Sequence, residues 1–379
     1  MDKIEKLKKT PIYYVINTEG IGGAEKRFSD LWYSGNEIGY EFHLVIDTKC
    51  YEKFCEIEEY KQKFLKYAHR LHNLNIYGSN YYTYIYNCWK YFSKVPKNSV
   101  IHFPLSYVFG LRLFFGLKTV SSYVACLNIY NFENIGKLKS NLFRIFGFYS
   151  ANAIDVLDPL NYKKLSKRFF CKNKINQTKG ITHFNTLLYK PKEKKNIYTF
   201  LGRFNEEKQI LKFISILPEL NAMLLRARVK NYTFYICGNG EQLDEILNSV
   251  GKDSFKNVKL KIFFAKDPPE ILGKSNIFFS LQKTSNYPSR SLAEAIGCGC
   301  FPIVTNTGDT ELMIKGIRSY HMVPKSFNAQ NIFEGIMKYN NKTKKEKYLL
   351  KNELNKYAIK HYSINKQLNY YLKLYSNII

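Results

Sequence analysis

Residues 279–302 read FSLQKTSNYPSRSLAEAIGCGCFP, and they contain the strand, loop, helix and strand that decide the fold. The apolar run ends at about Leu281, and a polar loop with a proline follows it. We expect a helix from near Ser291 to Gly297 or Gly299, and then the next buried strand. A strand that returns through a helix is the repeating unit of a doubly wound parallel sheet in an α/β protein.

The same alternation extends in both directions from this stretch. Short runs rich in β-branched and aromatic residues recur, and segments with helical periodicity lie between most of them. Because these runs are apolar throughout rather than alternating, they indicate sheets that helices cover on both faces. We expect strands at residues 11–16, 42–46, 100–103, 123–127 and 153–157, and then at residues 197–201, 233–237, 260–264, 277–281, 301–304 and 321–323.

A polar, lysine-rich segment interrupts the alternation at residues 182–196, which read THFNTLLYKPKEKKN. We interpret it as the linker between two Rossmann-like domains, residues 1–185 and 186–361. Residues 365–379 carry apolar side chains at helical spacing, so we expect a last helix that packs on another element.

The 379-residue chain has 58 Lys and Arg against 31 Asp and Glu, a formal net charge of +27. This excess favours anionic partners, although a composition rich in Lys, Asn, Ile and Tyr explains it equally well. The sequence shows no nucleic-acid-binding module, so we expect no nucleic acid partner. The eight cysteines lack metal-site spacing, and we see no signal peptide and no membrane-spanning run, so we expect a cytoplasmic protein.

Glycines follow the first expected strand at Gly20, Gly22 and Gly23, and a helix should begin at about Gly23. Glycine lets a backbone approach a ligand closely, and free N–H groups at a helix start attract anions. A plain tight turn between strand and helix accounts for this loop about as well.

Two further loops follow strands in the second half. Arg203 and Lys208 flank a turn after residues 197–201, and they could grip a diphosphate from two sides, although two solvated surface charges are the simpler reading. Residues 238–240 read GNG, a tight turn that could lie beside a ligand or serve as an ordinary turn.

The helix near Ser291 offers a third feature of this kind. Its bare N–H groups could hold phosphate oxygens, and Glu294, one turn in, could accept hydrogen bonds from ribose hydroxyls. A capping box formed by Ser291 and Glu294 would explain the same two residues without any ligand.

In this order, the loops resemble those of the family 4 glycosyltransferases, which are retaining enzymes of the GT-B fold. That fold has two Rossmann-like domains facing across a cleft. The similarity is strong over residues 198–312, and in the first domain it is confined to the glycine loop. The segments that carry it are GGAE at residues 22–25, GRFNEEK at 202–208, GNGE at 238–241, YPSRSLAEA at 287–295 with CGCFP at 298–302, and TGDTE at 307–311.

The resemblance implies a role for each matching residue. Arg203 and Lys208 would neutralise the donor diphosphate, and Glu294 would hold the ribose. The other donor-binding residues would be Gly22, Gly23, Gly202, Gly238, Asn239, Gly240, Tyr287, Pro288, Ser289, Arg290 and Ser291. The family also implies that the last helix, about residues 362–379, packs back on the first domain.

One position departs from the family pattern. The family's loop usually has a glutamate eight positions before the residue that matches Glu294, and this chain has Asn286 there. An amide can still bind a sugar hydroxyl but has no charge, so we include Asn286 with Arg203, Lys208 and Glu294 in the catalytic set.

The resemblance implies a hexosyltransferase that needs no cofactor and no metal. A nucleotide-diphosphate-sugar would be the donor, and the acceptor would be a glycan or a lipid-linked glycan, as in the synthesis of capsule, lipopolysaccharide or other surface polysaccharide. Basic and aromatic residues mingle at 137–149, which suggests peripheral contact with an anionic membrane at the inner face, or a core helix with a cationic rim. The alternatives are a catalytically silent GT-B binding protein and a nonspecific basic nucleic-acid binder.

Overall fold

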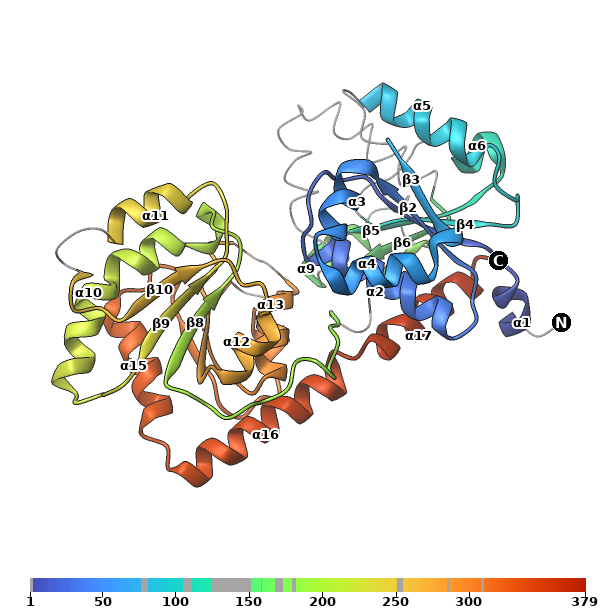
Figure 1. The fold of residues 1–379 in the computed structure, drawn as a ribbon. Coiled ribbons are helices and arrows are strands. Elements are labelled where there is room, and N and C mark those ends of the chain that lie inside the picture. The colour runs from blue at the N-terminus through green and yellow to red at the C-terminus, as the bar shows by residue number, and fades with distance from the viewer. Residues whose placement is uncertain are drawn as a thin grey trace. The chain divides into compact units, whose positions relative to one another are not determined.

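The computed structural model describes residues 3–75, 81–104, 111–123, 151–157, 159–167, 173–178, 182–250, 255–284, 287–307 and 310–379. The chain divides into two compact units, one formed by Met1–Ile181 with Ile364–Ile379 and the other by Thr182–Ser363. Each unit is a parallel sheet with helices on both faces (Figure 1), which confirms the fold class predicted from the strand–helix alternation.

The sheet of the first unit has the strand order β3-β2-β1-β4-β5-β6-β7, and every pairing in it is parallel. Its strands are β1 (Ile12–Ile16), β2 (Phe42–Asp47), β3 (Leu71–Leu74), β4 (Val100–Phe103), β5 (Lys118–Tyr123), β6 (Ala153–Val156) and β7 (Ile175–Gln177). Its helices are α1 (Lys3–Lys8), α2 (Gly23–Glu37), α3 (Thr48–Cys55), α4 (Glu58–Lys66), α5 (Tyr81–Phe92), α6 (Leu111–Phe115), α9 (Pro159–Leu165) and α17 (Ile364–Ser376), with the 3-10 turn η1 (Ala68–Arg70).

The central strand β1 shows how this sheet forms two cores. Ile12, Tyr14 and Ile16 pack toward α2 and α17, whereas Tyr13 and Val15 pack on the other face with residues of α5 and α6. Side chains alternate between the faces of a strand, so a strand that is apolar at all five positions must be covered on both sides.

The second unit repeats this plan with the strand order β10-β9-β8-β11-β12-β13, again all parallel. Its strands are β8 (Ile197–Leu201), β9 (Thr233–Cys237), β10 (Leu260–Phe263), β11 (Ile277–Ser280), β12 (Phe301–Thr305) and β13 (His321–Val323). Its helices are α10 (Ile210–Arg226), α11 (Leu243–Val250), α12 (Pro268–Lys274), α13 (Arg290–Gly297), α14 (Thr310–Ile314), α15 (Ala329–Asn340) and α16 (Lys344–His361), with the 3-10 turn η3 (Glu206–Lys208).

The strand expectations in the first unit differ from the structure in three places. The strand predicted at residues 123–127 meets β5 (Lys118–Tyr123) only at Tyr123, and residues 124–127 lie outside the described residues. The strands β3 and β7 were missed. Both lie at an edge of the sheet, and their side chains are partly exposed, so they lack the continuous apolar run of a central strand.

The last helix, α17, completes the first unit by packing against α1 and α2 (Figure 1). The contact between α17 and the rest of the first unit contains charged as well as apolar side chains. The hydroxyl of Tyr371 accepts a hydrogen bond from Arg27 Nη2 at 3.0 Å and donates one to Asp155 Oδ2 at 2.9 Å. All three side chains are buried. One phenol thus links a buried guanidinium of α2 to a buried carboxylate of β6.

Replacing Tyr371 with Phe is expected to lower the free energy of unfolding by about 2 kcal/mol, because two hydrogen bonds to charged groups are lost inside the protein. The matched control is Tyr375→Phe. Within the described part of the chain, the Tyr375 hydroxyl forms hydrogen bonds to two neutral side chains, His102 at 2.6 Å and Tyr14 at 3.0 Å. Denaturant unfolding of both variants would test this. An equal or larger loss in Tyr375→Phe would contradict the role given to Tyr371.

Candidate active site

The strand order of the second unit marks where a ligand can enter its sheet. From β8 the chain proceeds to β9 and β10 on one side, and then returns to β11 and the strands beyond it on the other. The loops after β8 and β11 therefore diverge at their carboxyl ends. Such a topological switch point is where open α/β sheets bind ligands.

Lys208 lies at this switch point. After β8 the chain turns through Arg203 into η3, whose first residues are capped by the Asn205 side chain, which accepts from the Lys208 amide at 3.2 Å. Lys208 is partly buried, and burial together with the nearby Arg203 guanidinium lowers the pKa of its ammonium group to about 8. Two cations held close together make a site that an anion would stabilise.

Gln282 joins Lys208 to the loop after β11. Its Oε1 accepts a hydrogen bond from Lys208 Nζ at 2.9 Å, and its backbone N–H donates to Thr305 Oγ1 at 2.6 Å. The Thr305 hydroxyl in turn donates to the Gln282 carbonyl at 2.9 Å. Gln282 is buried, so this strand end is rigidly placed and offers the lysine a neutral partner rather than a carboxylate.

Further pairs tie the same two loops together. Glu206 forms an ion pair with Lys283, and the Thr284 hydroxyl donates to the Glu207 carboxylate. The Lys283 amide also donates to the Glu207 carbonyl at 2.9 Å. These pairs occupy the neighbouring glutamates, whereas Arg203 is exposed.

A small pocket continues the site from Gln282 to the start of α13. Its lining mixes hydroxyl and amide groups with apolar side chains, as small-molecule sites do. The residues around it are Ser280, Gln282, Tyr287, Ser289, Leu292, Thr310 and Met313.

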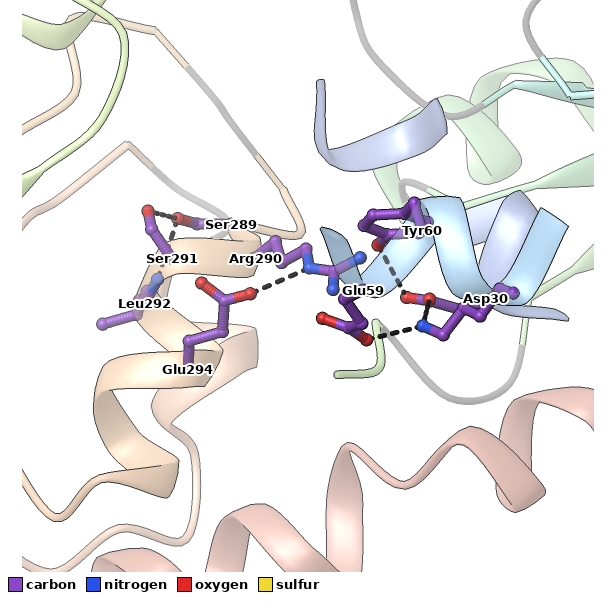
Figure 2. A network of polar contacts seen from close by, with 9 residues as sticks. Asp30, Glu59, Tyr60, Ser289, Arg290, Ser291, Leu292 and Glu294 are labelled. Carbon is purple, nitrogen blue, oxygen red and sulfur yellow. Dashed lines mark hydrogen bonds and ion pairs between the residues drawn. The ribbon is translucent and has the colours of Figure 1, made fainter. Parts of the chain in front are cut away.

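The start of α13 differs from the one predicted. The N-cap is Ser289, whose hydroxyl accepts from the Leu292 amide at 3.3 Å, and the helix begins at Arg290. The capping box of Ser291 and Glu294 is therefore wrong. Glu294 is buried and accepts from Arg290 Nε at 2.9 Å, one turn back along the helix (Figure 2). Its carboxylate is thus available to a ligand only in competition with, or together with, Arg290.

The glycines of the two neighbouring loops have different roles. A Cβ on Gly238 would lie 1.9 Å from the Gly202 carbonyl oxygen, and one on Gly240 would lie 2.3 Å from the Phe204 carbonyl oxygen. At Gly202 the nearest atom would be 3.7 Å away. Packing of the loop after β9 against the loop after β8 therefore requires Gly238 and Gly240. Asn239 takes part by accepting from the Phe204 amide through its carbonyl at 2.9 Å.

The glycine loop of the first unit lies at the corresponding switch point, after β1 and beside β4. As predicted, α2 begins at Gly23, with Gly22 as its N-cap. The Gly22 N–H donates to a carboxylate oxygen of Glu25 at 2.8 Å, and the Thr18 hydroxyl donates to the other at 3.1 Å. Glu25 thus fixes the loop and occupies the Gly22 N–H that was assigned to a ligand.

Some predicted features cannot be placed. Asn286 and residues 137–149 lie outside the described residues. Among the residues that are described, no three His, Cys, Asp or Glu side chains gather as a metal site would require. No helix in that part of the chain is long and apolar enough to cross a bilayer.

Sequence reasoning missed three residues of these loops, namely Gln282, Thr305 and Glu25. A polar residue directly after a buried strand at a switch point is a usable signal for Gln282, and Glu25 stands three residues after an N-cap. The contact of Thr305 with Gln282 depends on strand pairing, which a single sequence does not show.

Two doubly wound parallel-sheet units in one chain form a GT-B fold. Residues 189–361, which make up most of the second unit, match the family model of the glycosyl transferases group 1. The match contains Arg203, Lys208, Gln282 and Glu294. No curated protein matches the chain.

Solved structures of similar fold span nearly the whole chain. HepE of Anabaena, in complex with UDP and glucose, is 11% identical with a TM-score of 0.71, and the match covers 95% of this chain and 97% of that one. TarM of S. aureus, in complex with UDP and alpha-GlcNAc-glycerol, is 12% identical with a TM-score of 0.67, covering 97% and 99%. WaaG, a glycosyltransferase involved in lipopolysaccharide biosynthesis, is 12% identical with a TM-score of 0.63, covering 92% and 95%.

Proposed function

We propose that this glycosyltransferase takes a hexose from a UDP-sugar and transfers it, with retention, to a glycan or lipid-linked glycan in surface polysaccharide synthesis. The observation that carries the donor site is the pair of cations, Arg203 and Lys208, at the β8–β11 switch point. UDP as the donor nucleotide is supported by the complexes of HepE and TarM.

The reaction breaks the bond between the sugar's anomeric carbon and the diphosphate oxygen, and forms one to the acceptor oxygen on the same face. The acceptor proton passes to an oxygen of the leaving diphosphate, so no protein base is needed. The enzyme's task is to hold both substrates and to stabilise the charge that develops on the leaving group. Arg203 and Lys208 would do so without a metal ion.

The remaining donor contacts follow from the loops around these cations. The first amides of α13 would face a phosphate or sugar hydroxyl, because they lie at the positive end of a helix. Glu294 would accept hydrogen bonds from the ribose hydroxyls while Arg290 holds its carboxylate in place. Gly202 leaves room for close approach of the diphosphate, and Asn286 would bind the transferred sugar.

We further propose that the protein acts in the cytoplasm at the inner face of the membrane, where a lipid-linked acceptor is accessible. A transfer assay tests the whole proposal. The purified chain is mixed with UDP-glucose, UDP-galactose or UDP-GlcNAc and membrane lipid extracts, and UDP release is measured with and without EDTA. We expect acceptor-dependent UDP release that EDTA leaves intact. Nucleotide binding without release under any condition would favour the catalytically silent protein.

The pH dependence of the reaction is expected to depend on Lys208. Because only the protonated amine stabilises the leaving group, kcat/KM should fall as pH rises through about 8, the pKa that burial and Arg203 give this lysine. Gln282→Glu would place a carboxylate beside the Lys208 amine, which would raise the pKa of Lys208 and move this decline to higher pH. Gln282→Leu, the neutral control, should not move it upward. An unchanged decline in Gln282→Glu would contradict the assignment.

A further inference from the structure

The helices α5 and α6 of the first unit expose a cluster of large apolar side chains. Leu113 and Phe114 are 53% and 63% exposed, and Tyr86 is 63% exposed. The Trp89 ring of α5 lies 5.0 Å from the Phe114 ring of α6, so the two helices, which lie side by side in Figure 1, form one surface. We call Tyr86, Trp89, Leu113 and Phe114 the aromatic patch.

The aromatic patch is not simply the outer side of a core helix. The buried side of α5 is formed by Tyr84, Cys88 and Phe92, which pack on the sheet. Tyr86 lies elsewhere on the helix surface, where a soluble helix would ordinarily carry polar residues. Neighbouring exposed apolar side chains of this size usually mark a binding surface.

Charge around the aromatic patch identifies what it would bind. Lys90, Lys94 and Lys97 are exposed in α5 and the turn that follows it. Residues 81–118, which contain α5 and α6, include no Asp or Glu. The basic residues of that stretch are Lys90, Lys94, Lys97, Arg112 and Lys118. A surface that joins aromatic and lysine side chains, in a stretch without carboxylates, complements an anionic lipid headgroup layer above an apolar one.

We propose that the aromatic patch, with Lys90, Lys94 and Lys97, docks the protein on an anionic bilayer. Tyr86, Trp89, Leu113 and Phe114 enter the interface, and the lysines contact the headgroups. This docking surface rests on the proposed function for its biological meaning, because an enzyme that uses lipid-linked acceptors must reach the membrane. Docking itself requires no catalysis and can be measured alone.

The experiment is flotation of the full chain with vesicles of phosphatidylcholine, with and without phosphatidylglycerol. We expect binding to the anionic vesicles that weakens with salt, because headgroup attraction is screened. The double variant Leu113→Asp with Phe114→Asp should bind roughly tenfold more weakly or worse, since it loses two apolar anchors and gains two charges. Replacing Lys90, Lys94 and Lys97 with Ser should weaken binding and flatten its salt dependence.

The matched control is Leu187→Asp with Leu188→Asp in the second unit. These two leucines are also adjacent and exposed, at 74% and 46%, and their replacement changes the net charge equally. Retained binding in this control supports the aromatic patch. The proposal is overturned if the wild-type chain ignores anionic vesicles, or if both double variants lose binding equally. Self-association without vesicles that only the Leu113 and Phe114 variant abolishes would also overturn it, in favour of a second copy.

Failure here and failure of the proposed function can be told apart. UDP should raise the melting temperature of the wild type and of both double variants alike, because the donor site lies in the other unit. Vesicle binding without stabilisation by UDP would refute the donor site and leave the aromatic patch standing. Stabilisation by UDP without vesicle binding would do the reverse.

Discussion

Replacing Arg203 with Ala, or Lys208 with Met, is expected to lower kcat by about 10²- to 10³-fold, the usual cost of removing one preorganised group that stabilises a leaving charge. Both side chains follow β8 at the switch point. The positive charge of Arg203 disfavours a second positive charge on Lys208, and a bound diphosphate would relieve this repulsion. A loss in kcat larger than the change in KM would show that the contact strengthens as the diphosphate leaves. Initial rates of UDP release at saturating donor measure it.

The control for this pair is Lys283→Met, which removes a cation from the same loop cluster. Lys283 forms an ion pair with Glu206 and is largely exposed, so its replacement should change kcat by less than about threefold. Equal losses in Lys208→Met and Lys283→Met would mean that net positive charge, rather than the position of Lys208, supports the reaction.

Gly238→Ala is expected to lower the free energy of unfolding by about 3 kcal/mol or more and to abolish transfer. A methyl group at this position would lie 1.9 Å from the Gly202 carbonyl oxygen and 2.7 Å from the Phe204 ring. The Gly202 carbonyl belongs to the backbone and cannot rotate away as a flexible side chain can. The loops after β8 and β9 must therefore separate to make room for the methyl group. Arg203 lies between Gly202 and Phe204, so it would move with them. Chemical denaturation and the rate of UDP release measure the two effects.

Gly202→Ala provides the contrast, because its Cβ would meet nothing closer than 3.7 Å. The unfolding free energy should change by less than about 1 kcal/mol. If the donor diphosphate lies against Gly202, the same variant should weaken donor binding while leaving the melting temperature of the free protein unchanged. A Gly202→Ala protein as unstable as Gly238→Ala would refute this account of the two loops.

The sequence was most informative where physical constraints are local. Strands buried on both faces, such as β1 and β8, are apolar at nearly every position, so their runs could be recognised without a structure. The glycine-rich turns after them were visible for the same reason. Edge strands such as β3 and β7 are short and partly exposed, and a single sequence gives them no comparable signal.

The sequence pointed to the charged residues of the candidate site but not to their hydrogen-bond partners. Arg203, Lys208 and Glu294 could be singled out by residue type and by position after a strand or at a helix start. Their partners could not, because Gln282 reaches Lys208 only through the pairing of β8 with β11. The cap of α13 was misplaced by two residues, since Ser289 and Ser291 are chemically equivalent candidates and only the backbone decides between them.

One measurement tests the central claim, that Arg203 and Lys208 form the diphosphate site of a nucleotide-sugar enzyme. Binding of uridine, UMP and UDP is compared by calorimetry for the wild type, Arg203→Ala and Lys208→Met. We predict that the wild type binds UDP more tightly than UMP, and that each variant loses most of this difference while its affinity for uridine is unchanged. Equal affinity of the wild type for UMP and UDP, or an undiminished preference for UDP in both variants, would contradict the claim.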